Sequence, residues 1–193
     1  MEDSILIIII IVFIYIFLYL NKSSLTFVES SSTGIKYLVQ NDNDKKDTSE
    51  LLGEVVFRMY KLRDHLSITK ELHSEFKLYI EQLEGNFNES RTSIYENKKG
   101  SKYTSYSVNK GEEIVFCLKS KNTEKNHDIN LIMYVAIHEM AHLACPEIGH
   151  TPLFNKIFKF FIEQAIEKGF YKFKNYGNNP TEYCGMILTS NIL

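Results

Sequence analysis

Three histidines and a glutamate within thirteen positions are the residues of this chain with the clearest chemical potential. His138, Glu139 and His142 form the pattern HExxH, in which the two imidazoles are four residues apart. On an α-helix this spacing puts both rings on one face, about one turn apart, where they can bind the same cation. Glu139, next to the first histidine, can reach a water molecule at that cation. The pattern predicts a Zn2+ site with His138 and His142 as ligands and Glu139 as general base.

A third ligand would complete a site that keeps one position open for water, as catalytic zinc sites do. His150 follows a break that contains proline and glycine and directly precedes another helix start, so its ring can be held in place. We therefore predict His150 as the third metal ligand. Glu163 is the competitor, by analogy with zincins that use a glutamate, and Glu147 and Cys145 remain further candidates. The other histidines are interpreted as surface or core residues: His65, His73 and His127.

The segment that carries the pattern is predicted as a helix for reasons independent of its histidines. Asp128 can cap a helix that runs through residues 131–145, and Pro146 ends it. Thr151 as N-cap and Pro152 in the first turn then begin another helix with an apolar stripe. The two metal ligands of the first helix are therefore expected to be held rigidly.

The remainder of the chain predicts an α+β fold, with a small mixed sheet packed on about four helices. Apolar residues that recur at three and four positions indicate the helices, and alternating patterns indicate the strands. The hairpin strand Glu113–Leu118 is predicted as the rim of a peptide cleft, because extended substrate can add to a sheet edge. The other predicted elements are a first strand in 34–41, helices in 50–66 and 72–83, a hairpin of 103–108 with 113–118, and a last strand in 181–193.

The N-terminal segment is the most apolar part of the chain. Residues 5–20 are sixteen positions without a charge or a helix breaker. At about 1.5 Å per residue they form roughly 24 Å of helix, somewhat less than the ~30 Å hydrocarbon core of a bilayer. Tyr15 and Tyr19 near its end, and Lys22 beyond it, are residue types that favour a membrane interface. We predict an N-terminal transmembrane anchor over residues 1–22.

The flanks of this segment separate an anchor from a signal peptide. Glu2 and Asp3 precede it where a signal peptide carries basic residues, so an uncleaved anchor fits better than a cleaved signal or a buried core helix. The positive-inside rule favours the cytosolic side for the domain. A Ser- and Thr-rich linker is predicted over residues 23–33 and the folded domain over residues 34–193. The predicted localisation is a single-pass membrane protein.

Composition excludes several classes of protein. The 22 basic and 24 acidic residues leave a net charge of −2, which argues against nucleic acid as a partner. Apolar residues at 44% and charged residues at 24% argue against wholesale disorder. The cysteines number three and are widely spaced, which argues against a disulfide framework, and Cys184 is interpreted as a buried thiol.

The stretch HEMAHLACPEIGHTPLF (138–154) resembles minimal zincins of the WLM/SprT-like group. In that group an HExxH helix is followed by a short spacer, a Gly-His pair and an aromatic residue. The tail NPTEYCGMILTSNI also resembles the tails of uncharacterised HExxH proteins predicted in large DNA viruses. The resemblance covers 34–193 and implies a zincin-like metallopeptidase fold that binds zinc. The matching positions here are His138, Glu139, His142, Gly149, His150 and Phe154.

These observations predict a membrane-anchored zinc endopeptidase that acts on a protein or peptide substrate. Zinc would acidify and orient a water molecule, and Glu139 would take its proton and pass it to the leaving amine. Tyr183 is interpreted as a core or rim residue that could also donate to an oxyanion. The alternatives are a membrane-tethered binding or structural protein, for example of a virion, whose zinc site is stabilising or inactive, and a secreted protease. A fourth protein ligand would favour the structural alternative.

Overall fold

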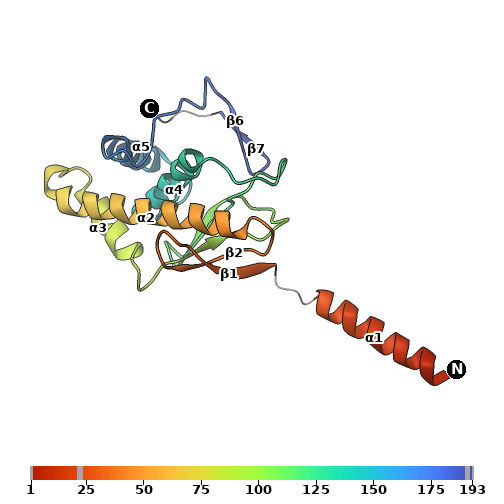
Figure 1. Ribbon diagram of the computed structural model, residues 1–193. Coiled ribbons are helices and arrows are strands. Elements are labelled where there is room, and N and C mark those ends of the chain that lie inside the picture. Colours follow the sequence, from red (N-terminus) through yellow and green to blue (C-terminus); the bar gives the residue numbers. More distant parts are fainter. Residues whose placement is uncertain (1, 21–23, 190–191, 193) are drawn as a thin grey trace.

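The structure is a computed structural model that describes residues 2–20, 24–189 and 192, and within the first helix the side chains of residues 7–17. Figure 1 shows its helices and strands in chain order. They are α1 (Glu2–Leu20), β1 (Leu25–Glu29), β2 (Lys36–Gln40), α2 (Lys45–Thr69), the 3-10 turn Lys70–Leu72, α3 (Lys77–Asn86), β3 (Ser93–Glu96), β4 (Tyr106–Val108), β5 (Glu113–Phe116), α4 (Ile129–Ala144), α5 (Pro152–Glu167), β6 (Thr181–Tyr183) and β7 (Met186–Leu188).

The central sheet is small and mixed. Its strand order is β3-β5-β4, with β3 parallel and β4 antiparallel to β5. The antiparallel pair β1–β2 lies beside it, because the backbone N–H of Gln40 donates to Glu96 Oε2 at 2.6 Å and its side-chain amide donates to the carbonyl of Asn97 at 2.9 Å. Strand β1 falls inside residues 23–33, the stretch predicted as a linker, and all five of its residues pair with β2. The chain has the α+β class that its sequence predicts.

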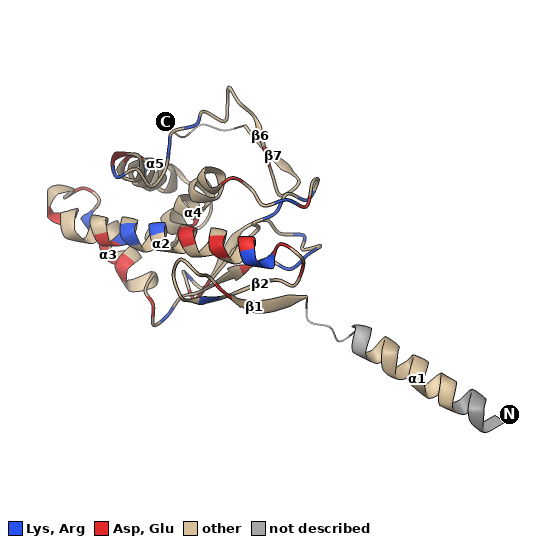
Figure 2. Cartoon of the chain, viewed as in Figure 1, with Lys and Arg blue, Asp and Glu red and all other residues tan. Residues whose placement is uncertain are grey.

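Helix α4 is the centre of the hydrophobic core. Its residues are apolar on nearly all sides, and a helix of that kind is stable only when neighbours cover it. Helices α2, α3 and α5 pack around it. The two helix starts predicted around it are confirmed: Asp128 caps α4 by accepting from the Asn130 backbone N–H, and Thr151 caps α5 by accepting from the Phe154 N–H. In Figure 2 most of α4 and α5 is uncharged, whereas acidic and basic residues are interspersed along α2.

The prediction of an N-terminal transmembrane helix is wrong. Among the residues that the structure describes, no helix is long and apolar enough to cross a membrane. Helix α1 has 19 residues, and its first two are Glu2 and Asp3. The charge-free remainder forms at most about 25 Å of helix, short of the ~30 Å hydrocarbon core. The prediction of a single-pass membrane protein is therefore wrong as well.

The C-terminal segment and two cysteines also differ from the prediction. The tail forms a hairpin rather than one strand, because β6 and β7 pair antiparallel across a turn at Cys184 and Gly185, both with positive φ. Cys184 is not a free thiol: it forms a disulfide with Cys117, 67 residues earlier in the chain. Cys145 is the free, buried cysteine of the described residues. Spacing along the chain could not reveal this pair, because the approach of β5 and the tail is tertiary.

Candidate metal centre

The three predicted histidine ligands converge on one point. The Nε2 atom of His142 lies 3.2 Å from that of His138 and 3.2 Å from that of His150, and the Nε2 atoms of His138 and His150 are 3.0 Å apart. Two nitrogens that bind one zinc ion tetrahedrally at about 2.0–2.1 Å are roughly 3.3 Å apart. The spacing of the three nitrogens therefore fits a single ion of this size.

Hydrogen bonding among the rings does not account for this arrangement. Each Nε2 of a neutral imidazole is either a donor or an acceptor, so three of them cannot satisfy one another around a triangle. Burial, followed by the neighbouring histidines, lowers the pKa of His138 to about 3, and burial with His150 and Lys110 lowers the pKa of His142 to about 4. Both rings are therefore neutral near pH 7, which is the form that binds metals.

Local structure explains how the triad is assembled. His138 and His142 lie on one face of α4, and His150 comes back to them at the end of the connection between α4 and α5. Gly149 has a φ of +84°, a conformation that favours glycine, and it precedes His150 directly. Thr151 then caps α5, so His150 is held between a tight turn and a rigid helix.

Phe154 is an apolar support for all three imidazoles. Its ring stacks on His142 with centroids 4.2 Å apart, and lies 5.0 Å from His138 and 5.0 Å from His150. The sequence predicts it both as part of the packing stripe of α5 and as the aromatic of the WLM/SprT-like resemblance. The side chain is fully buried, so the rings of the triad have a fixed surface on one side.

Glu139 lies next to the triad in an apolar environment. It is 5% exposed, and burial raises the pKa of its carboxyl to about 7, although the hydroxyl of Ser107 on β4 donates a hydrogen bond that lowers it. Tyr183 lines the same cleft as Glu139, and burial is the main cause that raises the pKa of its phenol, with a smaller contribution from the Glu139 carboxylate. The Tyr183 hydroxyl shares a hydrogen bond with Ser105. The sequence alone does not predict a role for Ser105 or Ser107, because only the tertiary position of β4 brings them next to Tyr183 and Glu139.

Lys110 links the C-terminal end of α4 to the sheet through hydrogen bonds. Its Nζ donates to the carbonyl oxygens of His142 at 3.1 Å, Cys145 at 2.5 Å and Glu147 at 3.3 Å. A cation at a helix C-terminus satisfies carbonyl groups that lack a partner in the helix and is favoured by the helix dipole. Lys110 lies in the turn between β4 and β5, so the hairpin and the connection that carries His150 are held together.

The triad and Glu139 line a cleft of about 1110 Å3. One border is β4, and the C-terminal hairpin contributes another part of the wall. The predicted rim strand, Glu113–Leu118, is wrong: β5 is the central strand of its sheet, covered on both sides by β3 and β4. Strand β3 pairs with one side of β5 and strand β4 with the other, so β4 is the edge strand next to the cleft. The residues that line the cleft from β4 and the hairpin include Ser105, Tyr106, Ser107, Tyr183, Met186 and Leu188.

The competing ligand candidates lie outside the triad. Glu163 is half-exposed on α5 and lies 4.0 Å from Lys159, four residues earlier. Cys145 is buried, while Glu147 is exposed and lines the cleft. Within the described ranges the cluster that could hold a metal consists of the three histidines alone.

Fold and site together describe an α+β protein with a candidate three-histidine metal centre. The chain belongs to the family of "Uncharacterized protein R325" of Acanthamoeba polyphaga mimivirus, to which it is 43% identical over 172 residues, or 89% of this chain and 86% of that protein. It is also similar to "Uncharacterized protein 042R" of Invertebrate iridescent virus 3, with 37% identity over 67 residues, 35% of this chain and 42% of that protein. "Uncharacterized protein 136R" of Invertebrate iridescent virus 6 is 38% identical over 69 residues, 35% of this chain and 38% of that protein. These relatives are viral proteins. No protein-family model matches the chain, and no solved structure matches it.

Proposed function

We propose that this protein is a zinc-dependent endopeptidase of the WLM/SprT-like zincin type. The observation that carries the proposal is the convergence of three imidazoles, with Nε2 atoms 3.0–3.2 Å apart, beside a buried glutamate in a large cleft. His138, His142 and His150 would hold the metal. Three protein nitrogens leave one position for water or substrate, which is the arrangement of catalytic rather than structural zinc sites.

The chemistry divides between the metal and the chain's own residues. A bound zinc ion would supply Lewis-acid chemistry, by lowering the pKa of a water molecule and polarising the peptide carbonyl. Glu139 would take the proton of the attacking water and return it to the nitrogen of the leaving amine. Ser107 would hold the Glu139 carboxylate in position through its hydrogen bond. The Tyr183 phenol lies in the wall of the same cleft, is 2% exposed and bonds to Ser105, so it would support the cleft wall next to Glu139.

The edge strand β4 suggests how substrate lies in the cleft. Its inner side pairs with β5, and residues 104–107 on the other side line the cleft. An extended peptide can add to such an edge through main-chain hydrogen bonds, whatever its sequence. The apolar part of the cleft, with Val135, Phe158 and Leu188, would take an apolar side chain of that peptide.

A purely structural zinc site is the competing function. Such sites are usually closed by four protein ligands. In the part of the chain that the structure describes, the cluster offers three, and neither Cys145 nor Glu147 belongs to it. The depth of the cleft around the triad also favours a substrate site over a structural one.

The test combines zinc content with peptide cleavage in the full-length chain. We expect one zinc ion per wild-type chain and cleavage of unfolded casein. Glu139→Gln should keep the zinc and lose cleavage by about 10²-fold or more, because general-base catalysis is removed while the ligands stay. His150→Ala should lose both. Glu163→Gln is the matched control, since this glutamate lies away from the triad and is paired only with a surface lysine.

Two results would contradict the proposal. A folded wild-type chain without tightly bound zinc would show that the triad is not a metal site. A Glu139→Gln variant that cleaves casein at the wild-type rate would show that Glu139 is not the base.

A further inference from the structure

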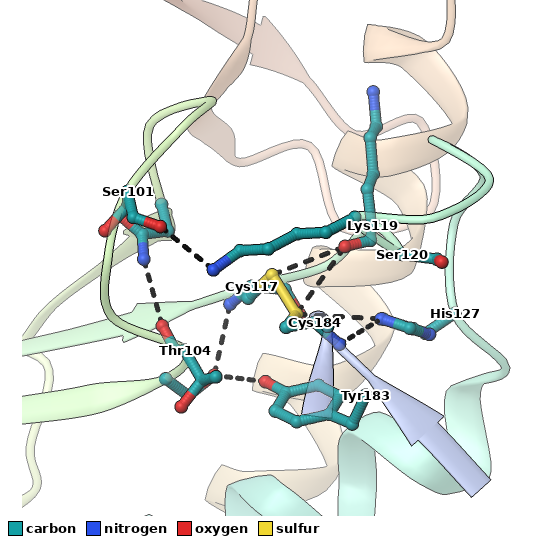
Figure 3. The surroundings of a disulfide bond; sticks show 12 residues. Ser101, Thr104, Cys117, Lys119, Ser120, His127, Tyr183 and Cys184 are labelled. Carbon is teal, nitrogen blue, oxygen red and sulfur yellow. Dashed lines mark hydrogen bonds between the residues drawn. A yellow bond between two sulfur atoms is a disulfide. The ribbon is translucent and has the colours of Figure 1, made fainter. Parts of the chain in front are cut away.

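The disulfide lies at the boundary between the metal cleft and a second cavity. Cys117 follows β5 directly, and Cys184 is in the turn of the β6–β7 hairpin (Figure 3). Tyr183, the residue before Cys184, lines the metal cleft. Cys117 instead lines a separate cavity of about 470 Å3. Cys184 lines neither of these two cavities. A molecule in the second cavity therefore meets Cys117 first.

The second cavity suits a thiol reagent. Lys119 and Lys121 line it close to Cys117 in the sequence. Lys119 is paired with Asp42, which lines the same cavity, and the Lys121 ammonium donates to the carbonyl of Ser101 at 2.9 Å. The lining also includes acidic residues, so the cation that bears on the disulfide is Lys121, whose side-chain carbons lie within 4 Å of the position that a Cβ on Gly185, the neighbour of Cys184, would take. Its positive charge near the disulfide would favour the approach of a thiolate, which is the form that attacks sulfur. The volume is large enough for a small peptide-sized thiol to enter.

The other sulfur lies next to the imidazole of His127. Cys184 Sγ is 3.6 Å from Nε2 of His127, and the same nitrogen accepts the Cys184 backbone N–H at 3.3 Å. Burial lowers the pKa of His127, which favours the neutral ring. A thiolate that leaves from Cys184 would accept a hydrogen bond from Nε2–H in the tautomer that carries its proton there, and this tautomer gives up the bond from the Cys184 N–H. His127 was interpreted from the sequence as an ordinary surface or core histidine, and the proximity to Cys184 becomes visible only in the folded chain (Figure 3).

The surroundings also accommodate the reduced cysteines. The carbonyl oxygen of Lys119 lies 3.3 Å from Cys117 Sγ and 3.5 Å from Cys184 Sγ, and the carbonyl oxygen of Cys117 lies 3.4 Å from Cys184 Sγ. Each new S–H group would therefore find an acceptor without a rearrangement of β5. Both redox states can be formed on the same framework.

We propose that Cys117–Cys184 is an exchangeable disulfide, which a small thiol attacks at Cys117 through the second cavity while Cys184 leaves next to His127. The thiol loses its proton, its sulfur bonds to Cys117 Sγ, and the S–S bond breaks so that its electron pair stays on Cys184 Sγ. Cys184 then takes up a proton. A second thiol attacks the mixed disulfide, so that two thiols are oxidised to one disulfide and the protein disulfide becomes two thiols.

This exchange would regulate the metal cleft, an inference that rests on the proposed function. The bond ties the C-terminal hairpin to β5, and the hairpin contributes Tyr183 and Met186 to the wall of the cleft. The proposed zinc ligands come from α4 and from His150 in the loop between α4 and α5, so they do not depend on the bond. Reduction should loosen the substrate wall and leave zinc binding unchanged.

The experiment treats the folded full-length protein with glutathione and traps free thiols with iodoacetamide before peptide mass mapping. We expect glutathione on Cys117 and the carbamidomethyl group on Cys184, while the buried Cys145 stays unmodified. His127→Phe keeps an aromatic ring next to Tyr183 but has no hydrogen-bond donor for the leaving thiolate, and should slow the exchange by about tenfold or more. His65→Phe is the matched control, because His65 pairs with Gln164 and lies away from the disulfide.

Three results would overturn the proposal: glutathione on Cys184, a disulfide that reacts only after the chain unfolds, or a His127→Phe variant that reacts at the wild-type rate. The regulatory part has its own measurements. After reduction, amide hydrogen exchange in residues 181–188 should rise and casein cleavage should fall at unchanged zinc content. A wild-type chain that exchanges its disulfide but never cleaves a substrate would refute the proposed function. The proposal of an exchangeable disulfide would still hold in that case.

Discussion

Replacement of Lys110 by methionine should weaken zinc binding without a direct change in any ligand. The Lys110 ammonium holds three carbonyl oxygens of the segment between His142 and Glu147, and this segment returns His150 to the triad. Methionine keeps much of the length and apolar contact of the lysine stem but removes all three donors and the charge. The end of α4 and the loop after it should then move relative to the β4–β5 turn.

The magnitude follows from the number and kind of bonds. A hydrogen bond from a charged donor contributes about 1.5–3 kcal/mol to stability when it is buried. Lys110 is half-buried, so water replaces part of its bonding and screens its charge, and we expect a loss of about 2–3 kcal/mol of unfolding free energy for the three bonds together. Loss of a residue that orients metal ligands typically weakens metal binding by about 10–100-fold, or about 1.4–2.7 kcal/mol.

The assay is a competition titration of the full-length protein with a chromogenic zinc chelator, together with thermal unfolding of the metal-free form. Lys110→Met should bind zinc about 10–100-fold more weakly than wild type. Lys102→Met is the control, because this lysine is exposed in the preceding loop. A folded Lys110→Met variant that binds zinc within twofold of wild type would refute the reasoning, since it would show that the loop holds His150 without the lysine.

Two further predictions concern stability. Burial raises the pKa of the Glu96 carboxyl to about 7 from an ordinary value of 4.5. Between these two pH values the folded state binds a proton that the unfolded state has lost. The unfolding free energy should therefore fall by about 3 kcal/mol as the pH rises from about 4.5 to 7. In urea unfolding at pH 5 and 8, Glu96→Gln should remove the contribution of Glu96 and leave that of Glu139, whose pKa burial also raises to about 7. A pH dependence equal to that of wild type would show that Glu96 does not contribute. Gly111→Ala should lower the unfolding free energy by more than about 1 kcal/mol, because its φ is +105° and a Cβ would lie 2.4 Å from the Asn86 carbonyl oxygen. Gly100→Ala, with a positive φ but nothing within 4 Å, should cost less, and equal melting temperatures of the two variants would contradict the clash.

The helical part of the candidate metal centre is predictable from the sequence because its determinants are local. The spacing of His138 and His142 places both on one face of any α-helix, and the apolar run around them indicates a buried helix. The caps Asp128 and Thr151 bond to backbone within three residues, so they can be identified without the fold. For His150, the sequence showed the break before it and the helix start after it. The remaining step, the approach of its ring to within 3.2 Å of the others, is tertiary.

Other predictions failed where long-range packing or length decides the outcome. The apolar N-terminal run has the composition of an anchor, but no helix in the described ranges is long and apolar enough to cross a membrane. The edge of the sheet was assigned to Glu113–Leu118, because β3, a short polar strand, was not recognised as its parallel partner. The disulfide joins residues 67 positions apart, and an odd number of cysteines gives no sign of it.

The sequence by itself determined the elements whose hydrogen bonds and side-chain contacts lie within a few residues: the capped helices, the β4–β5 hairpin, and the placement of two imidazoles and Glu139 on one helix. Only the tertiary structure decided which distant segments meet there. It brought Ser107, Lys110 and Tyr183 to the triad and paired Cys117 with Cys184. The physical reason is that local geometry follows from backbone dihedral angles and spacing, whereas contacts between distant segments depend on how the whole core packs and which chain ends that packing brings together.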